Sequence, residues 1–450
     1  MPSSITTVSK KTVLDLFRQD LESDDAAYYA AFSSADSSES GLFGQNQFRN
    51  EMNFIKVVSG KSFVVPNNTW TSGTVYKQYD DNDDDQTLFY VINSLNEVFL
   101  CVETPRDADN GYVELASEVE PTAALATSYN STTKTFKTSD RYLWRYLYKL
   151  TGLATSSFKT LDYMPVQKIA AASSVVELNQ QFSLQEASVP GQIINIAIDS
   201  GGTGYTFTPR ITINGNGTGA SFVATIEDGS IVSVTADSDG NRNISHGSGY
   251  NFAELELSVE GDASLRAVMG PIDGVNADPV ETLRSNQIMI QTKVEDDESG
   301  AIVVADPVND FKQVGLLRNP KKNTTDSDFT AFAGNCMNYF ELTDPNGTFA
   351  ADELFTAPSG ATGKTYWHDT VSSPDRLYYT RNHTTGFKSF EAGADDIDGE
   401  LNTASGSISA DVAPTVNRYS GQLLYINNLD NSIDRTSTQT EDIKIVIDLG

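Results

Sequence analysis

The chain has 450 residues, which at about 150 residues per domain predicts about three domains, each with its own core. Its 31 Lys and Arg against 61 Asp and Glu give a formal net charge of −30. Nucleic acid and anionic membrane are therefore poor electrostatic partners. Hydrophobic residues at 39% and aromatic residues at 10% support packed cores and exclude a wholly disordered acidic chain. Because glycines and short polar residues are abundant, we expect many turns and a β-rich fold.

The first predicted element is a short helix over residues 12–21. Thr12 and Asp15 have the spacing of a capping box. At helical spacing the apolar side chains fall on one stripe, formed by Val13, Leu16, Phe17 and Leu21. After this helix the dominant period is two residues, which is typical of strands.

The plainest strand is predicted over residues 142–150. One of its faces is strongly aromatic, carrying Tyr142, Trp144, Tyr146, Tyr148 and Leu150. Such a row of rings could form a glycan platform, but aromatic strand faces more often pack on a second sheet or on a partner chain. We therefore expect this face to lie inside a sheet packing or at a subunit contact.

Residues 186–275 contain an internal duplication. Each half reads as a β-branched strand, a glycine turn ending in Tyr, and a second strand. The turns are Gly202-Thr203-Gly204-Tyr205 and Gly247-Ser248-Gly249-Tyr250. Two copies are too few for a solenoid, so we expect a small self-packed β module inserted in a larger domain.

A second composition change covers residues 323–412. Residues 360–365 and 377–379 suggest short strands joined by tight turns, and we expect another inserted β module. Its polar tail, from residue 392 to Ala413, is expected to be largely loop. The last residues alternate as a strand does, with Ile443, Ile445, Ile447 and Leu449 on one face.

The predicted fold is thus mainly β with a few short helices, in several domains of mixed and antiparallel sheets. A core β domain comes in three pieces, with the two modules inserted between them. The predicted limits are 1–185 for the first core part, 186–275 for the duplicated module, 276–322 for the second core part, 323–412 for the second module and 413–450 for a C-terminal hairpin of the core.

No catalytic constellation emerges from the sequence. The only histidines are His246, His368 and His383, and neither a His-x-x-x-His nor a Gly-x-Ser-x-Gly pattern surrounds them. Gly60-Lys61-Ser62 and Gly363-Lys364-Thr365 imitate the end of a phosphate loop, but the glycine required five positions earlier is missing in both. The paired glycines of the duplicated turns lack the third glycine of a dinucleotide fingerprint, so both are expected to be turns.

Two acidic runs could gather oxygen ligands for a cation. The first is 80–85 and the second is 295–298. Neither has the loop pattern of an EF-hand, so we expect both to be solvated loops. Cys101 and Cys336 lack partners at zinc-site spacing and are expected to be buried thiols. We therefore assign no catalytic, cofactor-binding or metal-binding residue and expect no cofactor.

The beginning of the chain has no basic stretch followed by an apolar run, and no segment reaches the roughly 20 apolar residues that a membrane span needs. We expect a protein that is made and kept soluble. The sequons, such as Asn130-Ser131-Thr132, are interpreted as turn chemistry.

Several blocks, in order, resemble the baseplate wedge protein family that is the product of gene eight in T-even-type contractile-tailed phages. The most specific blocks are 310–320, which is similar to the family's Phe-Arg-Gln-Ile segment ending in Asn-Pro, and 419–428 followed by 439–445, which is similar to its closing hairpin. Further similar blocks are 28–32, 64–70, 90–92, 98–101, 140–148 and 163–166. Together they cover roughly half of the chain, and both inserted modules lie outside them.

The resemblance implies a non-enzymatic, β-rich virion subunit in the phage tail baseplate. It implies a homodimer that joins neighbouring wedge proteins, assembled in the host cytoplasm, with no nucleic-acid or membrane partner. One alternative is a virion adhesin that binds host glycan through exposed rings of the inserted modules, such as Tyr205, Tyr250 and Trp367. Another is a polysaccharide-cleaving enzyme on a β scaffold, for which the sequence offers no positive support.

Overall fold

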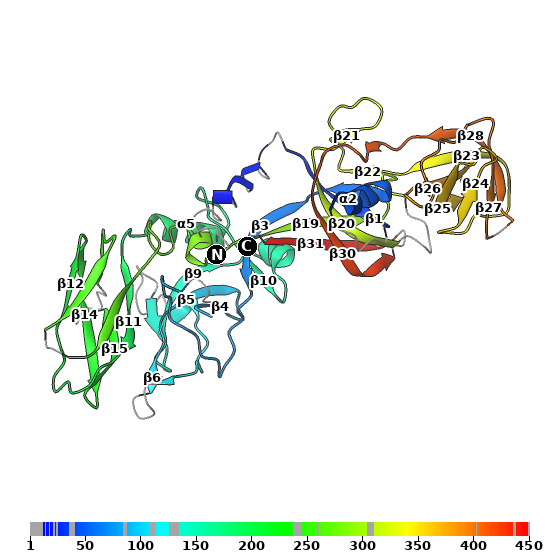
Figure 1. The fold of residues 1–450 in the computed structure, drawn as a ribbon. Coiled ribbons are helices and arrows are strands. Elements are labelled where there is room, and N and C mark those ends of the chain that lie inside the picture. The colour runs from blue at the N-terminus through cyan, green and yellow to red at the C-terminus, as the bar shows by residue number, and fades with distance from the viewer. Residues whose placement is uncertain are drawn as a thin grey trace. The chain divides into compact units, whose positions relative to one another are not determined.

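A computed structural model of the chain describes residues 12–13, 15–17, 19–20, 23, 26–35, 41–83, 88–107, 113–125, 135–236, 245–258, 261–303, 310–401, 403–434 and 438–448 (Figure 1). Leu21, Leu449, the end of the first acidic run (Asp84 and Asp85) and the sequon at Asn130 lie outside these ranges.

The fold is mostly β, as the sequence predicted. Strands make up 46% of the residues and helical residues 11%. The predicted helix at 12–21 is present in its described residues, although Val13 and Leu16 of its apolar stripe are exposed. The other named helices are short: α2 (Gly41–Asn50), α4 (Gly152–Phe158), α5 (Val176–Glu186) and α6 (Pro279–Thr282).

The chain divides into two compact units. The first comprises Met1–Lys61 and Ile290–Val446, and the second comprises Ser62–Met289 and Ile447–Gly450. The sequence predicted a single interrupted core domain, whereas the residues of that core are distributed between the two units. The physical reason is that each unit has sheets and apolar clusters of its own, which period-two patterning in a sequence does not separate.

A five-stranded antiparallel sheet forms the centre of the first unit. Its order is β22-β2-β1-β20-β30, formed by Ala333–Asn335, Met52–Val57, Tyr28–Ser33, Asp310–Arg318 and Gln422–Asp434. Every side chain of β1 is buried, and Ala30 and Ala31 let its neighbours pack closely. Phe32, Phe54 and Phe311 form a ring cluster on one face. Along the chain, β21 (Lys321–Lys322) follows β20 and β29 (Val416–Asn417) precedes β30. These two short strands pair with one another.

The first unit also contains a closed six-stranded barrel (Figure 1). Its order is β23-β26-β25-β24-β27-β28, formed by Asn338–Asn346, Asp375–Thr380, Thr362–Asp369, Leu354–Thr356, Asp396–Gly399 and Ser405–Val412. The barrel strands begin at 338, later than the expected insert at 323, because β22 pairs with β2 of the five-stranded sheet.

The loop predicted for residues 392–413 is wrong. Both β27 and β28 lie in this tail, and β28 pairs with β23 and β27. Gly406 and Ile408 of β28 point into the barrel, while Ser and Asp alternate with them on the outer side. The sequence did not reveal this strand because most of its residues are small or polar, and one inward position is a glycine that lies against Leu342.

The predicted closing hairpin is also not formed in the described residues. A four-stranded sheet has the order β10-β3-β19-β31, formed by Tyr163–Val166, Gly60–Pro66, Gln287–Glu295 and Thr440–Asp448. β30 and β31 follow one another in the sequence, but β30 pairs with β20 of the five-stranded sheet and β31 ends this second sheet. The final strand itself is confirmed, with Ile445 buried.

The second unit is built on a four-stranded sheet and the duplicated module. The sheet has the order β4-β5-β9-β8, formed by Tyr90–Ile92, Glu97–Glu103, Leu143–Lys149 and Thr135–Lys137, with a short ladder of β6 (Arg106–Asp107) and β7 (Val113–Glu114). α5 packs against β9, and its Leu184 contacts the aromatic cluster of the sheet.

The module has eight strands, which form ladders only with one another among the described residues. β11 (Ile193–Ser200) pairs with β18 (Ser264–Met269), and β12 (Ile211–Gly215) pairs with β17 (Ala253–Leu257). β13 (Thr218–Ala220) pairs with β16 (His246–Ser248), and β14 (Phe222–Glu227) pairs with β15 (Ser230–Ala236). One apolar cluster drawn entirely from residues 193–269 fills the interior.

The two halves of the module exchange equivalent contacts. The N–H of Tyr205 donates to the carbonyl of Gly229 at 3.0 Å, and the N–H of Tyr250 donates to the carbonyl of Gly191 at 3.1 Å. Each tyrosine ring also covers a glycine of the other half: Tyr205 lies on Gly261 and Tyr250 lies on Gly217. The turn glycines match as well, since all four have positive φ: Gly202, Gly204, Gly247 and Gly249.

The close ring contact makes Gly217 intolerant of a side chain. A Cβ at this position would overlap the Tyr250 ring. We expect Gly217→Ala to lower the free energy of unfolding by roughly 1–3 kcal/mol, the usual cost of overpacking. Urea or thermal unfolding measures this change. Gly152→Ala is the matched control, because a Cβ there meets nothing within 4 Å and should leave stability almost unchanged.

Candidate functional site

The aromatic strand face is part of the core of the second unit. All five of its predicted members are buried: Tyr142, Trp144, Tyr146, Tyr148 and Leu150. Trp144 stacks on the Tyr142 ring at 5.3 Å between centroids, and the Tyr142 hydroxyl donates to the carbonyl of Leu115 at 2.6 Å. The Tyr148 hydroxyl donates to the carbonyl of Pro165. The packing interpretation is therefore confirmed, and this row is no glycan platform.

The opposite face of the same strand holds a buried guanidinium. Arg145 is 7% exposed, and its Nε donates to Oδ1 of Asn276 at 2.8 Å. Its terminal nitrogens donate to the carbonyl of Val275 at 3.3 Å and to Oε1 of Gln192 at 3.5 Å. Burial lowers the pKa of Arg145 to about 10, so the side chain stays charged at neutral pH. No carboxylate pairs with it among the described residues.

The partners of Arg145 lie at the two ends of the duplicated module. Gln192 directly precedes β11, whereas Val275 and Asn276 come after β18. Asn276 returns the contact, because its Nδ2 donates to the carbonyl of Tyr146 at 3.2 Å. Arg145 thus fixes both stems of the module to β9 through neutral acceptors.

The first acidic run also holds the module in place. The Asp80 carboxylate accepts from Arg266 of β18 at 2.6 Å, and Asp81 accepts from the same guanidinium at 3.2 Å. Arg284 donates to the main-chain carbonyls of Asp80 and Asp83. Residues 81–83 are exposed, as expected of a solvated loop, but the first two carboxylates serve as structural ion-pair partners.

In the second acidic run, the expectation of a solvated loop is wrong for Glu298. This residue is 8% exposed, and its Oε2 lies 2.6 Å from Nζ of Lys56 in β2. The other three members, residues 295–297, are exposed. Among the residues that the structure describes, no three His, Cys, Asp or Glu side chains gather as a metal site would require.

The structure places the three histidines in separate environments. The Nδ1 atom of His246 lies 2.7 Å from the carbonyl of Ile193 in the core of the module. His368 accepts from the N–H of Phe349, and its Nε2 lies 3.6 Å from Asp375. His383 contacts Nε2 of Gln47 at 2.8 Å. None of the described contacts joins a histidine to a serine or cysteine nucleophile.

The motifs that imitate phosphate loops are strands. Gly60-Lys61-Ser62 begins β3, and Gly363-Lys364-Thr365 lies within β25. In extended backbone, successive N–H groups point to opposite sides and cannot cradle one phosphate. Neither segment therefore has the loop backbone that a phosphate-binding loop requires.

Two of the three rings proposed for glycan binding are not available. Tyr205 and Tyr250 are 6% and 5% exposed and belong to the core of the module. The sequence suggested exposed rings because each tyrosine follows a glycine turn. Their burial was not predictable, because the glycine that each ring covers lies in the other half of the module. Trp367 is half-buried and stacks on Tyr378 at 5.7 Å between centroids.

The outer side of the barrel carries a row of rings that the sequence did not reveal. Trp367, Tyr378 and Tyr339 are cross-strand neighbours on β25, β26 and β23. The guanidinium of Arg376 lies over the Tyr339 ring at 5.2 Å. Because the Trp367 and Tyr378 rings stack face to face at 13°, each ring covers one face of the other.

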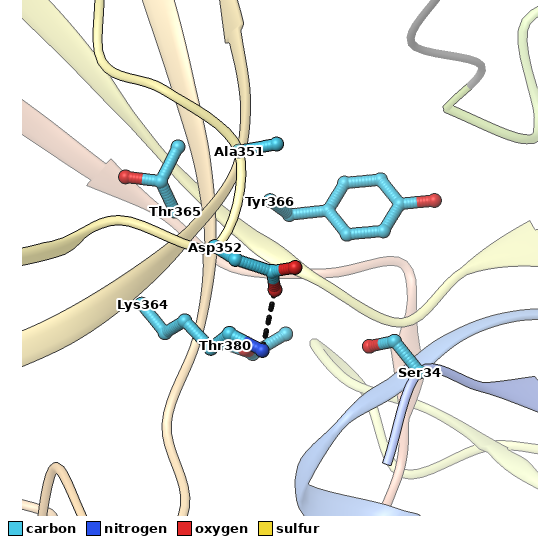
Figure 2. Close-up of a pocket in the computed structure, with 7 residues that line it drawn as sticks. All are labelled: Ser34, Ala351, Asp352, Lys364, Thr365, Tyr366 and Thr380. Carbon is cyan, nitrogen blue, oxygen red and sulfur yellow. Dashed lines mark ion pairs between the residues drawn. The ribbon is translucent and has the colours of Figure 1, made fainter. Parts of the chain in front are cut away.

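A hollow of about 300 Å³, open to solvent, lies on the first unit beside β25 (Figure 2). Its walls are Ser34, Ala351, Asp352, Lys364, Thr365, Tyr366 and Thr380. Nζ of Lys364 and Oδ1 of Asp352 form an ion pair of 2.5 Å across it. The lining holds neither His nor Cys, and its hydroxyl, ammonium and carboxylate groups offer polar contacts.

The comparisons with known proteins add no relative: no protein-family model matches the chain, and no curated protein matches it. None of the helices in the described ranges has the length and apolar character needed to cross a bilayer.

His246 gives the module a pH-dependent stability. Burial, with a smaller effect of the nearby Arg145 charge, lowers the pKa of His246 to about 4, against 6.5 for a free imidazole. The unfolded chain therefore binds a proton as the pH falls through 6.5, while the folded chain does so only near 4. We expect stability that is complete above pH 6.5 and falls by up to roughly 3 kcal/mol as the pH approaches 4.

Unfolding of the parent chain and of His246→Gln from pH 7.5 to 4.5 measures this effect. Carboxylates titrate in both proteins, so the difference between the two curves isolates the imidazole. A pH dependence that is identical in both would contradict the assignment.

Both cysteines should be inert in the native protein. Cys101 and Cys336 are 0% exposed and unpaired, and burial raises both thiol pKa values, that of Cys336 to about 12. We expect no reaction with a colorimetric thiol reagent at pH 8 and reaction of both thiols in denaturant. Rapid modification of either thiol in the native state would show that its surroundings open.

Proposed function

We propose that this chain is a structural, non-catalytic subunit of a contractile phage tail. In this proposal it is a homodimeric baseplate wedge component that joins neighbouring wedge proteins. It would be assembled in the host cytoplasm and would act without a cofactor, nucleic acid or membrane.

The observation that carries the proposal is where the family-like blocks fall in the fold. They coincide with strands of the three larger sheets: β1, β3, β4, β5, β9, β10, β20, β30 and β31. None of them lies in the duplicated module or in the barrel. A shared framework with inserted modules would give this distribution, because the residues that build a framework are constrained by its packing.

The way in which the module is held also supports a mechanical role. Arg145 fixes both of its stems, and Nδ2 of Asn195 donates to the carbonyls of Tyr79 and Val102 at 2.9 Å each. Arg266 adds ion pairs to Asp80 and Asp81. A module tied at several points transmits force as one body with its sheet, which a connector requires when its neighbours move.

Location of the subunit in the assembled particle tests the proposal. We expect an averaged image of the intact tail to place the chain between wedge components, in contact with at least two different proteins. Absence of the chain from the tail would contradict the proposal, as would turnover of a host polysaccharide by the purified protein.

A glycan array distinguishes the connector from an adhesin. The full chain and the variant Trp367→Ala are compared, because Trp367 is the remaining half-exposed candidate ring. We expect no glycan signal from either protein. A signal that is lost in Trp367→Ala would favour the adhesin instead.

A further inference from the structure

The five-stranded sheet of the first unit has one long open edge. β30 has 13 residues and is the last strand in the sheet order. Along its length it pairs with β20 on one side only, and its other side meets no strand among the described residues (Figure 1). The N–H and C=O groups on that side are thus available for another strand.

The composition of this edge differs from that of β31, which ends the second sheet. β31 carries Glu441, Asp442, Lys444 and Asp448 within nine residues. Charges at this density are the usual protection of an exposed edge. β30 has no charged residue from Gln422 through Leu429. The other end strands of these sheets, β22, β10, β4 and β8, have at most four residues and offer little edge to pair with.

The pairing with β20 defines which part of β30 is straight. Tyr425 to Asn428 lie opposite Leu316 to Gln313 without interruption, while bulges occur on both sides of this stretch. Leu424 is the extra residue of the first bulge and is 46% exposed. Asn427 and Asn428 are exposed as well. A four-residue straight segment with exposed flanks is long enough to add hydrogen bonds from a second strand.

We propose that β30 pairs antiparallel with β30 of a second copy of this chain, across a two-fold axis at the centre of residues 425–428. Tyr425 then faces Asn428 of the partner subunit, and Ile426 faces Asn427 of the partner subunit. Because the contact is isologous, each cross-strand pair occurs twice. This inference deepens the homodimer of the proposed function and rests on it.

Charge favours a second copy as the occupant. Two molecules that each carry −30 repel one another over most orientations. Approach is least costly where both surfaces are uncharged, and the segment 419–429 is such a strip. In the two-fold register no carboxylate faces another carboxylate, so the hydrogen bonds and the apolar contact of Leu424 are not opposed locally.

The test introduces a lysine at this edge. Leu424→Lys and Asn427→Lys are compared with the parent chain by analytical ultracentrifugation over a range of concentrations. We expect the parent to dimerise and each variant to raise the dissociation constant by at least about tenfold, the factor that 1.4 kcal/mol represents. Val371→Lys is the matched control, because Val371 is 93% exposed on the barrel and the charge change is the same.

The charge change makes the result decisive. Each lysine lowers the overall repulsion between copies, so weaker association can come only from a local effect at the edge. Unchanged circular dichroism and thermal midpoints establish that the variants fold. In hydrogen exchange, the outward amides of residues 425–428 should become protected as the parent concentration rises.

Two results would overturn the inference. If the parent dimerises and both edge variants dimerise equally well, the dimer contact lies elsewhere, and the dimer of the proposed function stands without it. If the parent remains monomeric at every concentration, both the edge pairing and the dimer are wrong, while the location of the subunit in the tail is still decided by imaging.

Discussion

The attachment of the duplicated module depends on Arg145, a buried cation that no carboxylate pairs with among the described residues. The Arg145 guanidinium donates to amide and carbonyl oxygens of the two stems of the module. Neutral acceptors satisfy its donors without adding a second buried charge, whose desolvation would cost several kcal/mol. In a strongly acidic protein, neutral acceptors also keep carboxylates from competing to bind the same guanidinium.

The same device occurs in the first unit. Arg49 at the end of α2 donates to the main-chain carbonyls of Arg418, Ser420 and Gly421. Arg418 in turn donates to the carbonyl of Asn50 and to Oδ1 of Asn338. Arg49 is half-buried, and this partial burial lowers the pKa of its guanidinium. In both units, an arginine therefore joins segments that are far apart in the sequence by donating to neutral carbonyl and amide oxygens.

Periodicity predicted the elements whose faces differ sharply. The aromatic alternation from Tyr142 to Leu150 identified a buried strand, and the alternation at Ile443 to Ile447 identified the last one. The method failed for β28, where a glycine occupies part of the inward face and serines lie on the outer face, because hydropathy cannot distinguish a small buried residue from a turn. It also failed for the burial of Tyr205 and Tyr250, since the glycines that they cover are distant in the sequence.

The contacts of Arg145 could not be predicted from the sequence for a similar reason. Nothing near residue 145 indicates that Gln192, Val275 and Asn276 come together there. The register of a strand can be inferred from local alternation, but the partner of a side chain depends on how distant segments close. For the same reason the sequence could not separate the carboxylates that pair, Asp80 and Glu298, from those that face solvent.

The reciprocal arrangement of the module has a consequence for how it comes apart. Each half supplies the ring that seals the other half, so neither holds a complete interior by itself. If one tyrosine leaves the glycine that it covers, the other half loses part of its packing. Intermediates with only one ordered half are therefore disfavoured. A nick or a lesion in either repeat should therefore melt the entire module in one cooperative step.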